Sequence, residues 1–393
     1  MEPSTLKLNT NPDKDPSHRA KIKWILLVAL FLLIAGVLFS FWLVFERSAE
    51  KKEIFADVDD SHLVYQPRDI PEEDNSYYVW VELDDEEISY PENYPPRPEY
   101  DHTNQGEQRA VRDDLLATGS LSKEQIGFIE ELRELNQPLL SVWDQAKTTP
   151  DFQYPGFADL SDVSVLPYGL INNLSLIKIL EARAQAATGE PAQAMEELFS
   201  VLEFTHSLSD QPVYLVGALV SIDLAEQTVK AMEQVVEREE FAPEERSAFA
   251  DRLEDHKRSG NDIANGFIME YSGKRELIKL MAQGEYEFLT EEVEMEEETL
   301  EMVDSEYWDS QLAHQLIFED YDLMYNNALK DCGEPLEELE ERWSDWEEIK
   351  EEGMEGAHSK MLHMITITDF SSAPDRSCDR DAQIEALQDK LRN

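Results

Sequence analysis

Hydrophobic residues recur at helical spacing over most of the chain after residue 105. The clearest run steps alternately by three and four positions: Leu215, Ala218, Ile222, Ala225, Val229, Met232 and Val236. This spacing places apolar side chains along one face of an α-helix, because side chains three or four positions apart lie one above the other. Together with similar runs elsewhere, it predicts an all-α domain over residues 106–370.

A short connection joins the two helical runs that precede residue 215. The first run ends at Gly189, a residue type that readily adopts the left-handed conformation found after many helices. The second begins at Pro191, where a missing backbone N–H group does least harm. In the first run, Leu170, Leu174, Ile177, Ala184 and Ala187 fall on one face, and the second run is expected to bury Ala194, Leu198, Val201 and Leu202. Connections this short predict antiparallel neighbouring helices.

Ser122 is predicted to cap a helix that begins at residue 123. Ser122 and Gln125 have the spacing of a capping box, in which each side chain satisfies a backbone N–H group at the helix start. The stretch from Ser120 to Lys123 also matches the Ser-x-x-Lys motif of penicillin-binding enzymes, but no Lys-Thr-Gly motif follows it. Capping therefore explains these residues better than catalysis does.

Residues 24–45 contain no charged side chain and are long enough to cross a hydrocarbon core of roughly 30 Å. Trp24 and Trp42 lie near the two ends, where aromatic side chains favour the membrane interface. A cleaved signal peptide is less favoured, because its apolar run is normally shorter and ends at small residues. A slight excess of Lys and Arg before the span predicts that residues 1–23 form a cytoplasmic tail. We therefore expect a single-pass anchor in the cytoplasmic membrane, with a periplasmic or extracellular soluble domain.

Residues 46–105 are predicted to form a Pro-rich extended stalk, because the run YPENYPPRPEYD (90–101) cannot be helical. The stretch SYYVWVEL (76–83) is rich in residues that favour strands. A lone strand needs a partner, so its aromatic side chains are expected to pack the stalk onto the main domain. Residues 371–393 are expected to form a short helix or a tail.

The chain of 393 residues has 85 Asp and Glu against 34 Lys and Arg, a formal net charge of −51. Such an acidic surface repels nucleic acid, so we expect no nucleic-acid partner. Residues 281–356 hold 27 acidic and three basic side chains, yet their apolar residues again step by three and four. This pattern predicts amphipathic helices with acidic outer faces, and diffuse cation binding is compatible with it.

Three such helices are expected, over residues 286–307, 308–330 and 335–353. In the second of them, the side chains expected to face inward are Trp308, Leu312, Leu316, Tyr325 and Ala328. Like charges one turn apart weaken these helices, so their stability is expected to depend on salt.

No catalytic, cofactor-binding or metal-ligating residue is predicted. The sequence has no P-loop and no Gly-x-Ser-x-Gly motif. The stretch DVDD (57–60) lacks the glycine and the late glutamate of a calcium loop, and His358 and His363 lack zinc-site spacing. The two cysteines, Cys332 and Cys378, form no zinc motif, and both one disulfide and two free thiols are compatible with the sequence.

The stretch EARAQAATGEPAQAMEELFSVLEF (181–204) resembles a tetratricopeptide hairpin, with small residues in its first helix, Gly189 at the turn and Ala194 early in its second helix. The match covers one unit, so an irregular arrangement of hairpins is expected. More widely, residues 72–370 are similar to a group of uncharacterised, exported, single-pass bacterial helical proteins. This resemblance implies an all-helical fold and supplies no catalytic residues.

These features favour a membrane-anchored, exported helical scaffold or adaptor that binds another protein at the cell envelope. One alternative is an enzyme of unrecognised type that acts on a cell-wall polymer, and another is a structural spacer with no specific partner. A groove with clustered exposed aromatic side chains would favour binding. A deep pocket with two or more groups of shifted pKa would favour catalysis.

Overall fold

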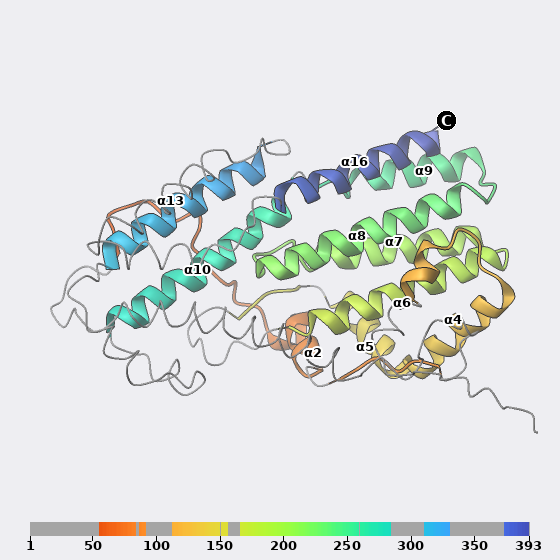
Figure 1. The fold of residues 1–393 in the computed structure, drawn as a ribbon, viewed down its shortest axis with the longest axis horizontal. Helices are drawn as coiled ribbons and strands as arrows, with labels where there is room; N and C mark the ends of the chain where they lie inside the picture. The colour runs from red at the N-terminus through yellow and green to blue at the C-terminus, as the bar shows by residue number, and fades with distance from the viewer. Residues whose placement is uncertain are drawn as a thin grey trace, which may run out of the picture.

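A computed structural model shows how the helices are arranged in space (Figure 1). It describes residues 55–83, 86–91, 112–149, 151–155, 166–258, 260–283, 310–330 and 373–392. The predicted anchor over 24–45 lies outside these residues, as do the predicted helices over 286–307 and 335–353. Among the residues that are described, no helix is both long enough and apolar enough to cross a membrane.

The described residues form helices and no strand, which confirms the all-α prediction. Apart from these helices, one β-bridge joins Asn75 to Asp151. In chain order the elements are the 3₁₀ helix η1 (Glu72–Asp74) and the helices α2 (Ser76–Val81), α4 (Lys123–Leu135), α5 (Gln137–Thr148), α6 (Tyr168–Ala187), α7 (Pro191–Ser207), α8 (Leu215–Val236), α9 (Pro243–Glu254), α10 (Asn261–Gln283), α13 (Ser310–Leu329) and α16 (Ala373–Arg392).

Helices α6 and α7 are joined by the short connection that was predicted around Gly189. Gly189 has a φ of 97°, in the left-handed region, directly after the end of α6. Its N–H group donates to the carbonyl of Ala186, and the N–H group of Glu190 donates to that of Gln185 at 3.1 Å. These two bonds form a Schellman motif, which satisfies carbonyl groups that a helix end leaves free. Pro191 is the first residue of α7, as predicted.

Helix α8 packs against both α6 and α7 and completes the central three-helix layer (Figure 1). The residues of its predicted seam from Leu215 to Met232 are buried, and Val236 is half-buried. The capping box at Ser122 is also present at the start of α4, where the hydroxyl accepts from the Gln125 N–H group. Local sequence signals therefore fix both the helices and their ends in this part of the chain.

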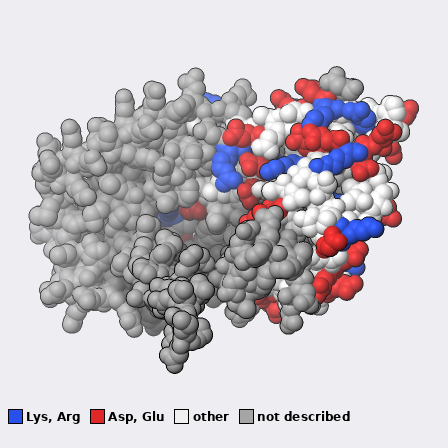
Figure 2. All heavy atoms as spheres, turned by 45° about the vertical axis from the view of Figure 1, so that its right-hand side comes forward, with Lys and Arg blue, Asp and Glu red and all other residues white. Residues whose placement is uncertain are grey.

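Helix α16 packs on both α8 and α9. Residues 373–392 thus form a 20-residue helix packed on the core, longer than the short helix or tail that was expected. On the face shown in Figure 2, Lys and Arg side chains lie among Asp and Glu. Arg252 of α9, for example, forms ion pairs of 2.7 and 2.5 Å with Glu196 and Glu203 of α7. These pairs contribute little each but neutralise the basic side chains locally.

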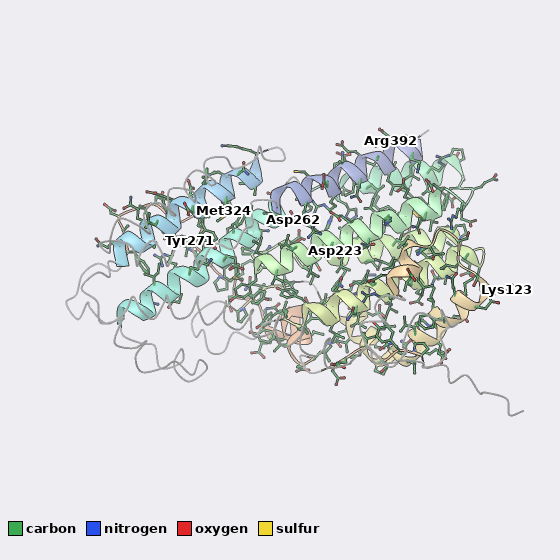
Figure 3. All side chains as sticks on the ribbon, in the orientation of Figure 1. Lys123, Asp223, Asp262, Tyr271, Met324 and Arg392 are labelled. Atoms are coloured by element: carbon green, nitrogen blue, oxygen red, sulfur yellow. The ribbon has the colours of Figure 1, made fainter. Side chains whose placement is uncertain are left out.

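Helix α10 runs past the end of α8 and packs along α13, and Figure 3 shows Tyr271 and Met324 on these two helices. The buried face of α13 consists of Ile317, Tyr321, Met324 and Ala328. The predicted inward residues Leu316 and Tyr325 are only half-buried, so the contact face is turned by one residue from the predicted one. The buried face of α13 is set by its contact with α10. The spacing of apolar residues within α13 carries no information about that contact.

Residues 55–83 lie on the helical domain, although they belong to the predicted stalk. The stretch 76–81 forms helix α2 and not a strand, because the Asn75 side chain caps it by accepting from the Tyr77 N–H group. Tyr77 and Trp80 are buried, and the Trp80 ring packs 5.9 Å from that of Phe204 on α7. The expectation that these aromatics attach the segment to the domain is confirmed.

Cys378 of α16 is disulfide-bonded. The chain has one other cysteine, Cys332, which lies outside the described residues. The open question between a disulfide and free thiols is therefore answered in favour of the disulfide for Cys378.

Candidate functional site

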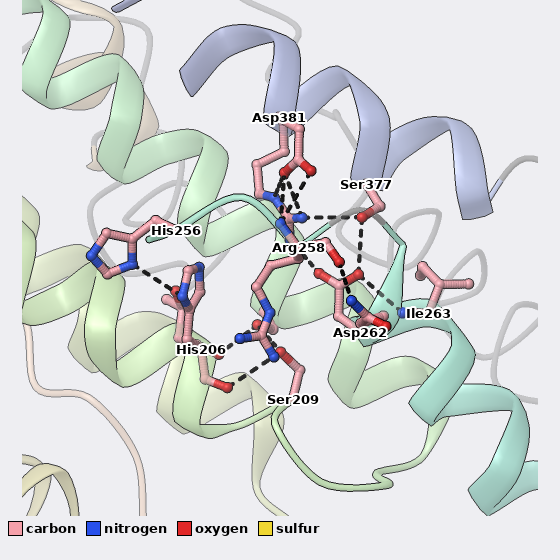
Figure 4. Close-up of polar contacts among 12 residues, drawn as sticks. His206, Ser209, His256, Arg258, Asp262, Ile263, Ser377 and Asp381 are labelled. Atoms are coloured by element: carbon pink, nitrogen blue, oxygen red, sulfur yellow. Dashed lines mark hydrogen bonds and ion pairs between the residues drawn. The ribbon is translucent and has the colours of Figure 1, made fainter. Parts of the chain in front are cut away.

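A buried ion pair joins the start of α10 to α16 (Figure 4). The carboxylate of Asp262 accepts from the guanidinium of Arg380, and its second oxygen accepts from the Ser377 hydroxyl at 2.9 Å. Both charged side chains are fully buried. Burial alone would lower the pKa of Arg380, but attraction from Asp262 and Asp381 outweighs burial and raises this pKa. The pair borders none of the described hollows, so we assign it to holding α16 against α10.

Arg258 extends this network to the end of α7 (Figure 4). Its backbone N–H group donates to Asp381 at 3.1 Å, and its guanidinium forms an ion pair with Asp210. The side-chain amide of Asn265 donates to the Ser209 carbonyl at 2.7 Å. These contacts fix the connection between α9 and α10 onto the neighbouring helices.

Two histidines meet between α7 and the end of α9. The Nδ1 atoms of His206 and His256 lie 3.0 Å apart, so one ring donates and the other accepts. Both rings are buried, and burial is the largest cause that lowers the pKa of each. The pair is therefore uncharged at neutral pH. Within the described part of the chain, no three His, Cys, Asp or Glu side chains are placed to hold a metal ion.

Asp60 binds the segment 55–65 to α10 and α13. Its Oδ2 atom accepts from the Tyr271 hydroxyl at 2.8 Å and from the Arg275 Nε at 2.7 Å, and lies 3.1 Å from the His314 Nε2. Burial would raise the pKa of Asp60, but the hydrogen bonds from Tyr271 and Arg275 outweigh it and hold this pKa below its ordinary value. Asp60, the last residue of the stretch DVDD, therefore attaches this segment to the helical domain.

Lys274 of α10 is a further group with a shifted pKa. Its ammonium lies 4.9 Å from the centroid of the Tyr321 ring, and burial lowers its pKa to about 8. It is half-buried and borders none of the described hollows.

An open hollow of about 230 Å³ lies where the ends of α6 and α8 meet the loop before α4. We call it the two-arginine hollow. Its lining residues are Gly119, Ser120, Leu121, Arg183, Ala186, Ala187, Gln234, Val235, Arg238 and Glu239. One side of the wall is therefore aliphatic and the other is charged.

Arg183 is fixed rigidly at the base of this hollow. Its side chain is buried, and its Nη1 donates to the carbonyls of Leu115 and Leu116 at 2.6 and 3.1 Å. Its Nη2 donates to the carbonyl of Thr118. Burial, together with the nearby charge of Arg238, lowers the pKa of Arg183 to about 10. No carboxylate of the described residues lies within ion-pair distance of Arg183.

Arg238 also lines the hollow and packs on Gly119. A Cβ added to Gly119 would collide with the Arg238 guanidinium. Arg238 also has no ion-pair partner among the residues whose positions are described. Other hollows hold arginines that form ion pairs: Arg133 with Glu181 at 3.4 Å beside α4, and Arg392 with Asp251 at 3.4 Å at the end of α16. Arg246, which also lines the hollow at the end of α16, donates to the Lys390 carbonyl at 2.5 Å. The two-arginine hollow is thus a local positive site on an acidic protein.

No site residue was predicted from the sequence, and the two-arginine hollow was not among the expected features. Arg183 stands between Ala182 and Ala184 in the small-residue face of the first hairpin helix, and a lone arginine on such a face was the available signal. Arg238 lies 55 residues later, beyond the end of α8, so no local spacing connects the two. His358 and His363 lie outside the described residues.

Comparison with known proteins adds no relative to this picture. No protein-family profile, no curated protein and no solved structure matches the chain.

Proposed function

We propose that the protein is a membrane-anchored, exported helical adaptor that binds another protein at the cell envelope. The observation that carries the proposal is the two-arginine hollow, an open site whose charge opposes that of the rest of the molecule. Arginine is enriched where proteins bind partners, and neither the buried Arg183 nor the exposed Arg238 has an ion-pair partner among the described residues. A tetratricopeptide-like use of α6 and α7, in which a hairpin presents its faces to a partner, is part of this proposal.

The polar centres favour binding over catalysis. An enzyme site needs two or more groups of shifted pKa around one accessible pocket. Among the described hollows, Arg183 is the one lining residue with a shifted pKa, whereas the histidines, the tyrosines and Lys274 whose pKa is shifted line none of them. The disulfide at Cys378 suits an oxidising compartment outside the cytoplasm, which supports export.

The test is chemical crosslinking in cells followed by purification of the full chain from detergent-solubilised membranes and mass spectrometry. We expect one enriched protein that binds again when both proteins are purified. Recovery of lipids and abundant envelope proteins alone, with no reconstituted complex, would instead support a structural spacer.

A further inference from the structure

We propose that the two-arginine hollow binds the carboxylate at the end of a polypeptide chain, together with that chain's last, aliphatic side chain. This inference rests on the proposed adaptor function and names the part of the partner that is recognised. It is carried by the charges, the size and the wall of the hollow.

The two arginine side chains of the hollow favour binding of an anion. The guanidiniums of Arg183 and Arg238 repel each other, and neither has a carboxylate within 4.0 Å among the described residues. Glu239 borders the hollow without pairing with either of them. A carboxylate between two guanidiniums removes the repulsion and accepts charge-assisted hydrogen bonds, the strongest kind available here.

The size of the hollow limits what accompanies the anion. A volume of about 230 Å³ is smaller than the roughly 300–1,000 Å³ of sites that enclose a whole small ligand. Leu121, Ala186, Ala187 and Val235 supply an apolar wall beside the arginines. One aliphatic side chain next to a carboxylate matches these dimensions and this chemistry, as in the last residue of a polypeptide.

The net charge of the whole chain determines which kinds of polypeptide can bring a carboxylate to the hollow. With a formal net charge of −51, the surface repels acidic proteins and polyanions but attracts neutral or basic ones. A single terminal carboxylate on a neutral or basic chain therefore meets attraction both at long range and in the hollow. An acidic peptide segment would meet repulsion everywhere except in the hollow.

The experiment measures binding of a fluorescent peptide to the full chain in detergent by anisotropy, at about 0.15 M NaCl. The probe ends in Lys-Lys-Ala-Leu with a free carboxylate, and the matched probe is its C-terminal amide. We expect the free acid to bind at least about tenfold more tightly than the amide, because a hydrogen bond to a charged group is worth roughly 1.5–3 kcal/mol. Equal binding of acid and amide, or binding of neither, would overturn the inference.

Three variants locate the site. Arg238→Gln is expected to remove most of the preference for the free acid, and Glu239→Gln to tighten binding by removing a nearby negative charge. Lys230→Gln is the matched control, because Lys230 is an exposed α8 residue that does not line the hollow and has no ion pair in the described structure. Circular dichroism melts establish that all three remain folded, and a preference that survives Arg238→Gln would place the carboxylate elsewhere.

The same variants separate this inference from the adaptor function. If the crosslinked partner is recovered equally with wild-type protein and with Arg238→Gln, the adaptor function stands and the terminal-carboxylate inference fails. If no partner is recovered with either protein, the adaptor function itself fails, whatever the peptide measurements show.

Discussion

At the scale of single residues, backbone conformation decides what Gly189 can be replaced by. Its φ of 97° lies where L-amino acids with a side chain are strained, and nothing lies within 4 Å of an added Cβ. Any cost of substitution is therefore conformational and not steric. Gly127, inside α4, also has open space at its Cβ but a helical backbone.

The two glycines make a matched pair for one substitution. We expect Gly189→Ala to lower the free energy of unfolding by about 1 kcal/mol, because alanine is strained in the left-handed region. We expect Gly127→Ala to raise it by about 0.5–1 kcal/mol, because alanine favours the helix interior. Thermal or urea unfolding measures both. A Gly189→Ala variant as stable as wild type would mean that the turn does not hold this conformation.

The histidine pair predicts how stability changes with pH. Burial lowers the pKa of His206 and His256 below the value of about 6.5 that unfolded histidine has. As pH falls below about 6.5, the two histidines bind protons more readily in the unfolded chain than in the folded protein. The free energy of unfolding therefore falls. Between pH 7 and pH 5, we expect this fall to be smaller in a His206→Leu, His256→Leu double variant. An unchanged slope would assign the pH dependence to other groups, of which His314 is the first candidate.

At the scale of elements, the Asp262–Arg380 pair decides how α16 joins the bundle. Both side chains are fully buried, so removal of one partner leaves an uncompensated charge in the interior. We expect Asp262→Asn or Arg380→Met to lower the free energy of unfolding by roughly 3–5 kcal/mol. Exchange of both partners for apolar side chains of similar volume is expected to recover much of that loss.

The control lies on the same helix. Arg392 and Asp251 are 3.4 Å apart with exposed side chains, and removal of such a surface pair costs at most about 1 kcal/mol. We therefore expect Arg392→Ala to melt close to the wild type. A large loss for Arg392→Ala and a small one for Asp262→Asn would show that α16 is held from its exposed end.

At the scale of the whole molecule, the net charge of −51 opposes compaction. Raising NaCl from about 0.01 M to about 0.15 M shortens the screening length from roughly 30 Å to roughly 8 Å. We therefore expect a higher melting temperature and more helix at the higher salt, measured by circular dichroism on the full chain. A melting temperature that stays flat or falls with salt would contradict this expectation.

Calcium at matched ionic strength separates diffuse from specific cation binding. Diffuse binding is expected to reproduce the effect of NaCl with no fixed stoichiometry. A sharp transition at a fixed ratio of calcium to protein would reveal a defined site and contradict the sequence-based expectation that there is none.

The sequence by itself determined the local structure of this protein. The alternating steps from Leu215 to Met232, the glycine at 189 and the capping box at Ser122 each act within a few residues along the chain. Helix periodicity, left-handed tolerance and side-chain capping depend on near neighbours, so the pattern contains them. The all-α class and the α6–α7 hairpin follow from these local signals.

The tertiary structure alone decided everything that depends on which helix lies beside which. Contact with α10 selected the buried face of α13, and contact with Phe204 of α7 buries the Trp80 ring. The Asp262–Arg380 pair joins residues 118 positions apart. Arg183 and Arg238 meet because α6 and α8 end at the same side of the bundle. Such contacts arise from packing between distant segments, which no local pattern in the chain records.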